Sequence, residues 1–279
     1  MPSETAPPVT GYYLELLTRV HRELRPRTYL EIGVHTGDSL TLVQPETLAI
    51  GIDPVASIRR PINRSAQLFF KTSDEFFASN NVKGLLGNRP VDLAFIDGMH
   101  LFEYALRDFR NVEASCGPDS VVLMHDCYPK SAAHASRHRQ QREWTGDTWK
   151  LVLCLMEYRP DLSVHTITVG ASGMSIIRGM NPNLVDNPLH TKYDEIVNKY
   201  IQLDFAEIEH RKSLALNAIP YDWDRITSIM PQGPLVTTPV APTKRARRVS
   251  IPIVLHQAKR YAKLLLSKEA RRNSVSSVS

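Results

Sequence analysis

The chain contains 279 residues, 42% of them hydrophobic, which suffices for one α/β domain with a sizeable core and appendages. No apolar run is long enough to span a membrane, and the N-terminus lacks the basic-then-apolar layout of a signal peptide. Three cysteines without a C-x-x-C pair argue against a disulfide framework or a zinc cluster. These features predict a cytoplasmic protein with reduced thiols.

The net charge of +5 is concentrated near the C-terminus. Residues 244–272 include ten Lys or Arg and one Glu, so they carry +9 and leave about −4 for the remainder. The basic balance therefore does not predict nucleic-acid binding by the core. Val254, Ala258, Tyr261 and Leu265 share one helical face, which favours a basic amphipathic segment lying on an anionic membrane surface. A disordered tail with no particular partner is the alternative.

The chain begins with a polar, proline-rich stretch, residues 1–10, that we expect to be disordered. In residues 11–25, apolar side chains recur at helical spacing. We expect this helix to pack on a sheet and to cover part of a ligand site.

Residues 28–44 form a strand, a turn and a helix in this prediction, because an apolar run precedes two glycines and a capping residue. Gly33 and Gly37 tolerate positive φ and let the backbone approach a ligand closely. Asp38 or Ser39 can cap the helix that follows. A helix N-terminus after a strand and a glycine turn is a common nucleotide site.

Two acidic residues are placed to serve such a site. Glu31 precedes Gly33 by two residues, and the spacing differs from the dinucleotide fingerprint G-x-G-x-x-G. A second strand, residues 48–52, ends at Asp53, where an acidic side chain can bind a ribose diol. An ordinary βαβ turn without a nucleotide is the alternative.

A third strand is predicted over residues 67–73, with Ser73 or Asp74 capping the next helix. Residues 91–96 then form a near-continuous apolar run, as in a central parallel strand, and end in Asp97 and Gly98. His100 follows, before a helix that ends near residue 116.

The fifth predicted strand, residues 120–126, ends in His125 and Asp126. The carboxyl ends of parallel strands meet at one edge of an open α/β sheet, where ligands bind. An isolated Asp at a strand end is usually a turn residue. Several polar strand ends at one edge, two of them with a histidine, favour a functional site.

Residues 128–145 are polar and rich in His and Arg, and the segment is long for a connection inside a compact domain. It is predicted to be a functional loop or lid, and a solvated basic face is the alternative. The residues that define its character are Pro129, His134, Arg137, His138, Arg139, Arg142 and Trp144.

The C-terminal half is predicted to contain a helix from Gly146 to about residue 158 and a strand pair over residues 162–177. Residues 181–229 form a helical extension, chiefly a helix over residues 193–218. Residues 230–279 form a proline-rich linker and the basic tail.

The sequence resembles class I S-adenosylmethionine-dependent methyltransferases, in its E-x-G-x-x-x-G pattern at Glu31, Gly33 and Gly37. More narrowly, residues 95–102, Phe-Ile-Asp-Gly-Met-His-Leu-Phe, resemble an F-I-D-G-x-H group in which a strand ending in His-Asp follows. Gly-Asp-Thr-Trp-Lys at 146–150 resembles members found beside glycan or glycolipid biosynthesis.

This resemblance implies a Rossmann-like domain over residues 11–180, with an open sheet of seven strands, mostly parallel with an antiparallel last strand, and helices on both faces. It also implies S-adenosylmethionine as cofactor. The motif with the two glycines would border the amino-acid part, Asp53 would bind the ribose, and the loop at residues 72–74 would lie beside the adenine. The cofactor-binding residues expected are Glu31, Gly33, Gly37, Ser39, Asp53, Ser73, Asp74 and Asp97.

Relatives that methylate sugar hydroxyls hold a divalent ion with acidic residues after the fourth and fifth strands. Carried over, these positions are Asp97, His125 and Asp126, where His-Asp replaces an acidic pair. Two carboxylates and one imidazole could hold Mg²⁺ or Mn²⁺, although histidine is less typical of a hard-cation site. His100 and His125 are the candidate catalytic residues, with His100 preferred as base because imidazole titrates near neutral pH.

The function predicted is methylation of a hydroxyl on a sugar, a glycan or glycolipid, or a small natural product. A nicotinamide-dependent oxidoreductase is one alternative, disfavoured by the missing fingerprint and by the C-terminal hairpin. A non-catalytic cofactor-binding protein recruited by its basic tail is another. The sequence leaves the oligomeric state open, and a homo-oligomer is among the states it allows.

Overall fold

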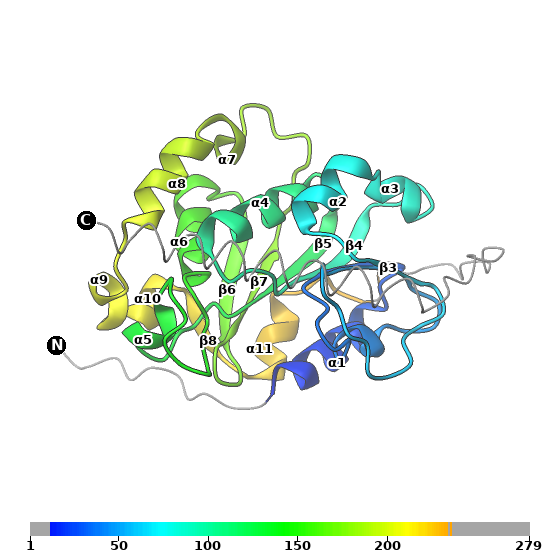
Figure 1. The fold of residues 1–279 in the computed structure, drawn as a ribbon, viewed down its shortest axis with the longest axis horizontal. Helices are drawn as coiled ribbons and strands as arrows, with labels where there is room; N and C mark the ends of the chain where they lie inside the picture. Colours follow the sequence, from blue (N-terminus) through cyan, green and yellow to red (C-terminus); the bar gives the residue numbers. More distant parts are fainter. Residues whose placement is uncertain (1–11, 234, 236–279) are drawn as a thin grey trace, which may run out of the picture.

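A computed structural model describes residues 12–233 and residue 235 (Figure 1). The predicted disordered N-terminus, most of the proline-rich linker and the basic tail lie outside these residues. In the described part, no helix has the length and apolarity needed to cross a membrane.

One open sheet runs through the molecule in the strand order β3-β2-β1-β4-β5-β7-β6-β8. All neighbouring strands are parallel except for the pairs that β7 makes with β5 and β6. The strands are β1 (Thr28–Ile32), β2 (Leu48–Ile52), β3 (Ala66–Phe69), β4 (Val91–Ile96), β5 (Cys116–His125), β6 (Ser163–Thr168), β7 (Met174–Arg178) and β8 (Ala218–Pro220).

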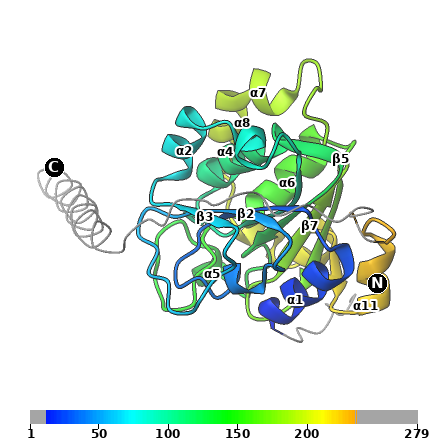
Figure 2. The same ribbon diagram turned by 90° about the vertical axis from the view of Figure 1, so that its right-hand side faces the viewer.

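Helices cover both faces of this sheet, as Figures 1 and 2 show. One hydrophobic core includes α2 (Ser73–Ser79), α4 (Phe102–Glu113), α6 (Trp149–Tyr158) and α8 (Tyr193–Ile201). The other includes α1 (Tyr13–Leu24) and α11 (Trp223–Ser228). The shorter helices are α3 (Val82–Leu85), α5 (Ala132–Ala135), α7 (Pro188–Thr191), α9 (Ala206–Glu209) and α10 (Lys212–Ala215).

The predicted fold class is therefore confirmed: a mostly parallel Rossmann-like sheet with one antiparallel strand and helices on both faces. β7 is the last of the seven strands expected from the sequence. The sheet has an eighth strand as well, because β8 extends it beside β6.

Two predicted helices differ in the structure. The one expected from Asp38 to Gln44 is a 3₁₀ turn, Leu40–Leu42. Val43 is already extended, and Gln44 precedes Pro45, where proline disfavours the helical conformation of the residue before it.

In place of the single helix expected over residues 193–218, the structure has three separate helices, α8, α9 and α10, followed by the strand β8. Asp204 accepts a hydrogen bond from the Ala206 N–H at 2.9 Å and so begins a new turn. Asn217, at φ 45°, leaves the helical conformation just before β8.

Candidate functional site

The carboxyl ends of β4 and β5 bring four ionisable side chains together. His100 Nε2 lies 3.2 Å from Asp97 Oδ1, and His100 Nδ1 lies 2.9 Å from Asp126 Oδ2. His125 Nδ1 lies 3.4 Å from Asp97 Oδ1 and 3.2 Å from Asp126 Oδ1. Two imidazoles thus alternate with two carboxylates. We call Asp97, His100, His125 and Asp126 the strand-edge cluster.

Gly33 sets the distance between the ends of β1 and β4. A Cβ on Gly33 would lie 1.9 Å from the backbone oxygen of Asp97, and Gly33 has φ +89°. The Gly33 N–H bonds to the Ile52 carbonyl at 2.9 Å, and the Asp97 N–H bonds to Ile32 at 2.8 Å. Only glycine lets the glycine turn and the strand-edge cluster lie this close.

Three loops at this edge contain a non-glycine residue in the left-handed region: His35 at φ 48°, His100 at φ 56° and Asp126 at φ 60°. They follow β1, β4 and β5. This conformation costs roughly 1–2 kcal/mol for a residue with a Cβ. Such strain concentrates at functional sites, so it supports a functional role for this edge.

Burial and opposite charge compete in setting the pKa values of the cluster. Burial alone would favour neutral forms. For His100, the hydrogen bonds to Asp126 and Asp97 outweigh burial and hold its pKa well above the usual range. Burial disfavours the Asp97 carboxylate, but the charges and hydrogen bonds of His125 and His100 outweigh it and lower the Asp97 pKa.

His125 follows the same rule, since Asp97 and Asp126 overcome its burial and raise its pKa. The expectation that His100 titrates near neutral pH therefore differs from the structure, in which Asp126 and Asp97 raise the pKa of the imidazole. The physical reason is that two carboxylates, Asp97 and Asp126, face the His100 ring and raise its pKa, and the sequence alone did not place both of them there.

The glycine turn rests on a buried carboxyl group. Tyr29 donates to Glu31 Oε2 at 2.8 Å, and Ser39 donates to Glu31 Oε1 at 2.5 Å. Burial raises the pKa of Glu31 to about 8, against the effect of these two donors. Glu31 is fully buried, so it and Ser39 support the turn from within the core.

Asp53 joins the turn after β1 to the loop after β2. Its Oδ2 accepts from the His35 N–H and its Oδ1 from the Val55 N–H, each at 2.7 Å. A carboxylate has about four acceptor positions, so two remain for hydroxyl donors of a ligand. Gly37, at φ +82°, packs against Ile58: a Cβ added to Gly37 would lie 2.8 Å from Ile58 Cδ1.

The cap of α2 is Thr72 instead of Ser73 or Asp74, which corrects the sequence expectation. The Thr72 hydroxyl accepts from the Glu75 N–H at 3.2 Å, and Glu75 returns a bond to the Thr72 N–H at 3.0 Å. This reciprocal pattern satisfies two free amides at once. Asp74 pairs with Arg107 of α4 at 2.8 Å, which orients it along the outside of α2.

The segment at residues 128–145 combines both alternatives raised by its sequence. His134 is buried, and the Trp144 ring stacks on His100 with centroids 5.4 Å apart. Residues 138–142, in contrast, are exposed. The loop is thus packed against the strand-edge cluster at its base and solvated at its tip.

Three further residues contact this cluster or its backbone, and the sequence analysis assigned none of them a role in the site by itself. The Tyr13 ring of α1 contacts the His125 ring, tilted by 47° with centroids 4.4 Å apart. Trp144 stacks on His100, and the Asp147 N–H donates to the His100 carbonyl. Trp144 follows a polar stretch, Tyr13 begins an amphipathic helix, and Asp147 lies two residues before α6. The signals in the sequence were the functional loop predicted over residues 128–145 and the helix expected to cover the site over residues 11–25.

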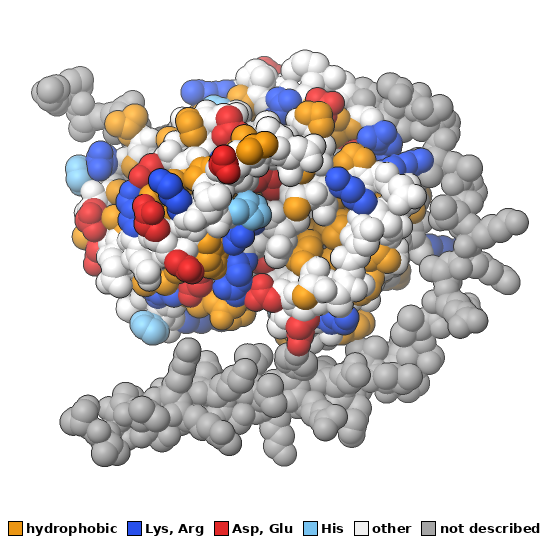
Figure 3. Space-filling view, turned by 90° about the horizontal axis from the view of Figure 1, so that it is seen from above, with side chains coloured by type: hydrophobic (Ala, Val, Ile, Leu, Met, Phe, Trp, Pro, Cys, Tyr) orange, Lys and Arg blue, Asp and Glu red, His pale blue; other side chains and the backbone are white. Residues whose placement is uncertain are grey.

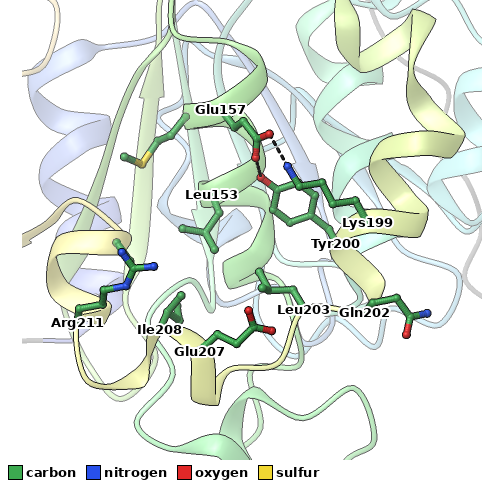
Figure 4. A pocket seen from close by; sticks show the side chains of 11 residues that line it. Leu153, Glu157, Lys199, Tyr200, Gln202, Leu203, Glu207, Ile208 and Arg211 are labelled. Carbon is green, nitrogen blue, oxygen red and sulfur yellow. Dashed lines mark hydrogen bonds and ion pairs between the residues drawn. The ribbon is translucent and has the colours of Figure 1, made fainter.

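A large open groove lies away from this edge, between α6, α8, α9 and α10, with a volume of about 630 Å³ (Figure 4). Leu153, Leu203 and Ile208 line it, and Glu157 bonds to Lys199 and Tyr200 at its rim. By contrast, the cavity that touches Asp97, His100 and His125 has only about 10 Å³. The size of a cavity alone therefore does not identify the candidate functional site.

On the face of the molecule in Figure 3, cationic and anionic side chains are interspersed.

Residues 30–127 match the model of a family described as a methyltransferase domain. The matched segment runs from β1 to the end of β5 and includes the glycine turn and the strand-edge cluster. The match supports the resemblance to class I methyltransferases noted in the sequence, while the narrower F-I-D-G-x-H group stays a prediction. No curated protein matches the sequence.

Several solved structures are similar to this chain. One is the O-methyltransferase TomG from Streptomyces achromogenes in complex with S-adenosylmethionine; it is 16% identical to this chain, the match covers 61% of this chain and 80% of TomG, and the TM-score is 0.45. An O-methyltransferase from Bacillus cereus with S-adenosylhomocysteine is 15% identical over 64% and 84%, with TM-score 0.41. A putative O-methyltransferase from Klebsiella pneumoniae is 14% identical over 65% and 84%, with TM-score 0.43. These likenesses are too distant to carry an argument about activity.

Proposed function

We propose that the methyltransferase domain transfers the methyl group of S-adenosylmethionine to a hydroxyl of a sugar, a glycan or glycolipid, or a small natural product. The observation that carries the proposal is a single sheet edge that joins a glycine turn to a strained cluster of two carboxylates and two imidazoles. The first half of this edge fits a nucleotide. The second half fits proton or cation chemistry.

The residues of the glycine turn fit the cofactor. Gly33 and Gly37 hold the backbone in left-handed conformations, and Asp53 keeps acceptor positions for a ribose diol at the next strand end. When bound, S-adenosylmethionine supplies a methyl carbon already activated by its sulfonium, so the protein mainly aligns the two reactants. In this proposal the loop after β4, with Asp97, separates the cofactor from the acceptor.

The strand-edge cluster would handle the proton of the acceptor hydroxyl. His100 and His125 are the proposed catalytic residues, with Asp97 and Asp126 orienting their rings. Because Asp126 and Asp97 raise the pKa of His100, a ring that carries a proton on both nitrogens can accept the hydroxyl proton only after it releases one. That proton would leave to solvent, to which the His100 side chain is 23% exposed, because the lowered pKa of Asp97 makes its carboxylate a poor proton acceptor.

The same residues fit a divalent cation. One ligand atom each from Asp97, His100 and Asp126 lies within 4.8 Å of the others, which adds His100 to the set expected from the sequence. His125 stands beside the two carboxylates. When bound, Mg²⁺ or Mn²⁺ would supply Lewis-acid activation of the hydroxyl, and the imidazole favours Mn²⁺ of the two.

Calorimetric titration of the full chain with S-adenosylmethionine, S-adenosylhomocysteine and NAD tests the proposal. We expect micromolar binding of both adenosyl ligands and none of NAD. Binding of NAD alone would replace the proposal with the oxidoreductase alternative. Adenosyl binding that persists with no methyl transfer to any sugar or phenolic hydroxyl, in a screen for S-adenosylhomocysteine release, would favour a non-catalytic cofactor-binding protein.

A further inference from the structure

We propose that Gly146 and Asp147 are positioning residues that hold His100 in its strained conformation over the carboxylates. This inference rests on the proposed function only for the meaning of His100, because the contacts themselves do not involve a cofactor. The Gly-Asp-Thr-Trp-Lys stretch at residues 146–150 would then serve the site although it lies about 50 residues along the chain from His100.

Gly146 fits against the backbone of His100. Its φ is +61°, and a Cβ at this position would lie 1.8 Å from the His100 carbonyl oxygen and 2.8 Å from the carbonyl carbon. The neighbour is backbone, so it cannot rotate away as a flexible side chain would. Any side chain at residue 146 must displace the turn that contains His100.

Asp147 grips the same turn at two points. Its backbone N–H donates to the His100 carbonyl at 3.1 Å, and its Oδ1 accepts from the Phe102 N–H at 2.8 Å. These bonds span Leu101 and fix the peptide groups on both sides of it. As a result, the left-handed φ of 56° at His100 is imposed from the opposite loop, and the imidazole points between Asp97 and Asp126.

Ion pairs hold the Asp147 side chain in place. The Asp147 side chain is completely buried, and its Oδ2 lies 2.5 Å from Arg137 and 3.1 Å from Lys150. Arg137 also pairs with Glu103 of α4 at 2.8 Å. A buried carboxylate with two cationic partners is costly to disturb, because removing one partner leaves an uncompensated charge.

Trp144 completes the support from the side of the ring. It stacks on His100 at an interplanar angle of 19°, and its Nε1 donates to the Ser136 carbonyl at 2.5 Å. An ordinary helix cap would need only the bond from Asp147 to Phe102. The close approach of Gly146 and the stacked Trp144 both act on His100 itself, which is why we assign a positioning role.

The test compares Gly146→Ala with Gly87→Ala. Gly87 has a similar φ of +66°, but an added Cβ would meet only Leu48 Cδ1 at 3.8 Å, so the control carries the backbone strain without the collision. The readout is the pair of imidazole nitrogen resonances of His100, assigned by their loss in His100→Gln. We expect them to move in Gly146→Ala and to stay in place in Gly87→Ala.

Equal His100 spectra in the two alanine variants would overturn the proposal. If Gly146→Ala does not fold, Asp147→Asn serves instead, because it keeps an oxygen for Phe102 but loses the charge that binds Arg137 and Lys150. Movement of the His100 resonances is again expected, and unchanged resonances would again overturn the proposal. Titration of the wild-type chain with S-adenosylmethionine is read separately, so a failure there rejects the proposed function and not the positioning role.

Discussion

His100 Nδ1 and Asp126 Oδ2 lie 2.9 Å apart, and both residues adopt left-handed backbone conformations to reach one another. Asp126 is held in place by a bond from its N–H to the Gly173 carbonyl at 3.1 Å, so the turn that leads into the antiparallel strand β7 supports one partner. The segment at Gly146 supports the other. Two separate parts of the C-terminal half thus converge on one ion pair at the end of the parallel sheet.

The first prediction concerns a divalent cation at this pair. We expect Mn²⁺ to bind the wild-type chain and Asp126→Asn to weaken binding at least ~10-fold, a difference of about 1.4 kcal/mol, since it removes one of two anionic ligands. Asp74→Asn is the matched control, because Asp74 belongs to an exposed pair with Arg107. Electron paramagnetic resonance of free Mn²⁺ measures both. Equal affinity in Asp126→Asn and the wild type would contradict the site.

The second prediction concerns Asp53. Replacing it by Ala removes the bonds to the His35 and Val55 amides and the free acceptor positions as well. We expect S-adenosylmethionine binding to weaken by roughly 10- to 100-fold, or about 1.4–2.8 kcal/mol, measured by calorimetry. Asp119→Ala, at an exposed position of β5, should leave the affinity unchanged. An Asp53→Ala protein with wild-type affinity would remove the ribose role.

The third prediction isolates steric contact from backbone strain at the glycine turn. Gly33→Ala places a Cβ 1.9 Å from the Asp97 oxygen, whereas Gly87→Ala meets nothing closer than 3.8 Å. Both variants pay the left-handed penalty of about 1–2 kcal/mol, but only the first must also separate β1 from β4. We expect Gly33→Ala to lose at least ~2 kcal/mol more in urea denaturation. Equal losses would show that the strands can part freely.

The sequence predicted much of this edge because it rests on local rules. Apolar runs that end in Asp53, Asp97 and Asp126 predicted three strand ends with acidic residues. In a parallel sheet these ends lie at the same edge. The sequence did not predict the raised pKa of His100, since that depends on two carboxylates that face one ring across a loop. It also missed the role of Asp147, because a bond to a backbone 45 residues away leaves no mark in local periodicity.

The last prediction concerns Asp108 of α4, which is only 3% exposed and whose Oδ1 has no hydrogen-bond partner in the described part of the chain. Burial raises the pKa of its carboxyl group to about 7, against a hydrogen bond from Ser73. The folded state therefore binds the proton more tightly than the unfolded state. Stability from this group is complete below about pH 4 and is lost as the pH rises towards 7.

Asp108→Asn keeps the shape and removes the titration, so the difference between wild-type and variant stability isolates this one group from the others that titrate nearby. We expect the wild type to lose ~4 kcal/mol relative to Asp108→Asn between pH 4 and pH 8, because its pKa is raised from 3.8 to about 7 and each pKa unit corresponds to about 1.4 kcal/mol. Urea denaturation at a series of pH values measures it. Parallel stability curves for the two proteins would mean that Asp108 is ionised in the folded state throughout this range.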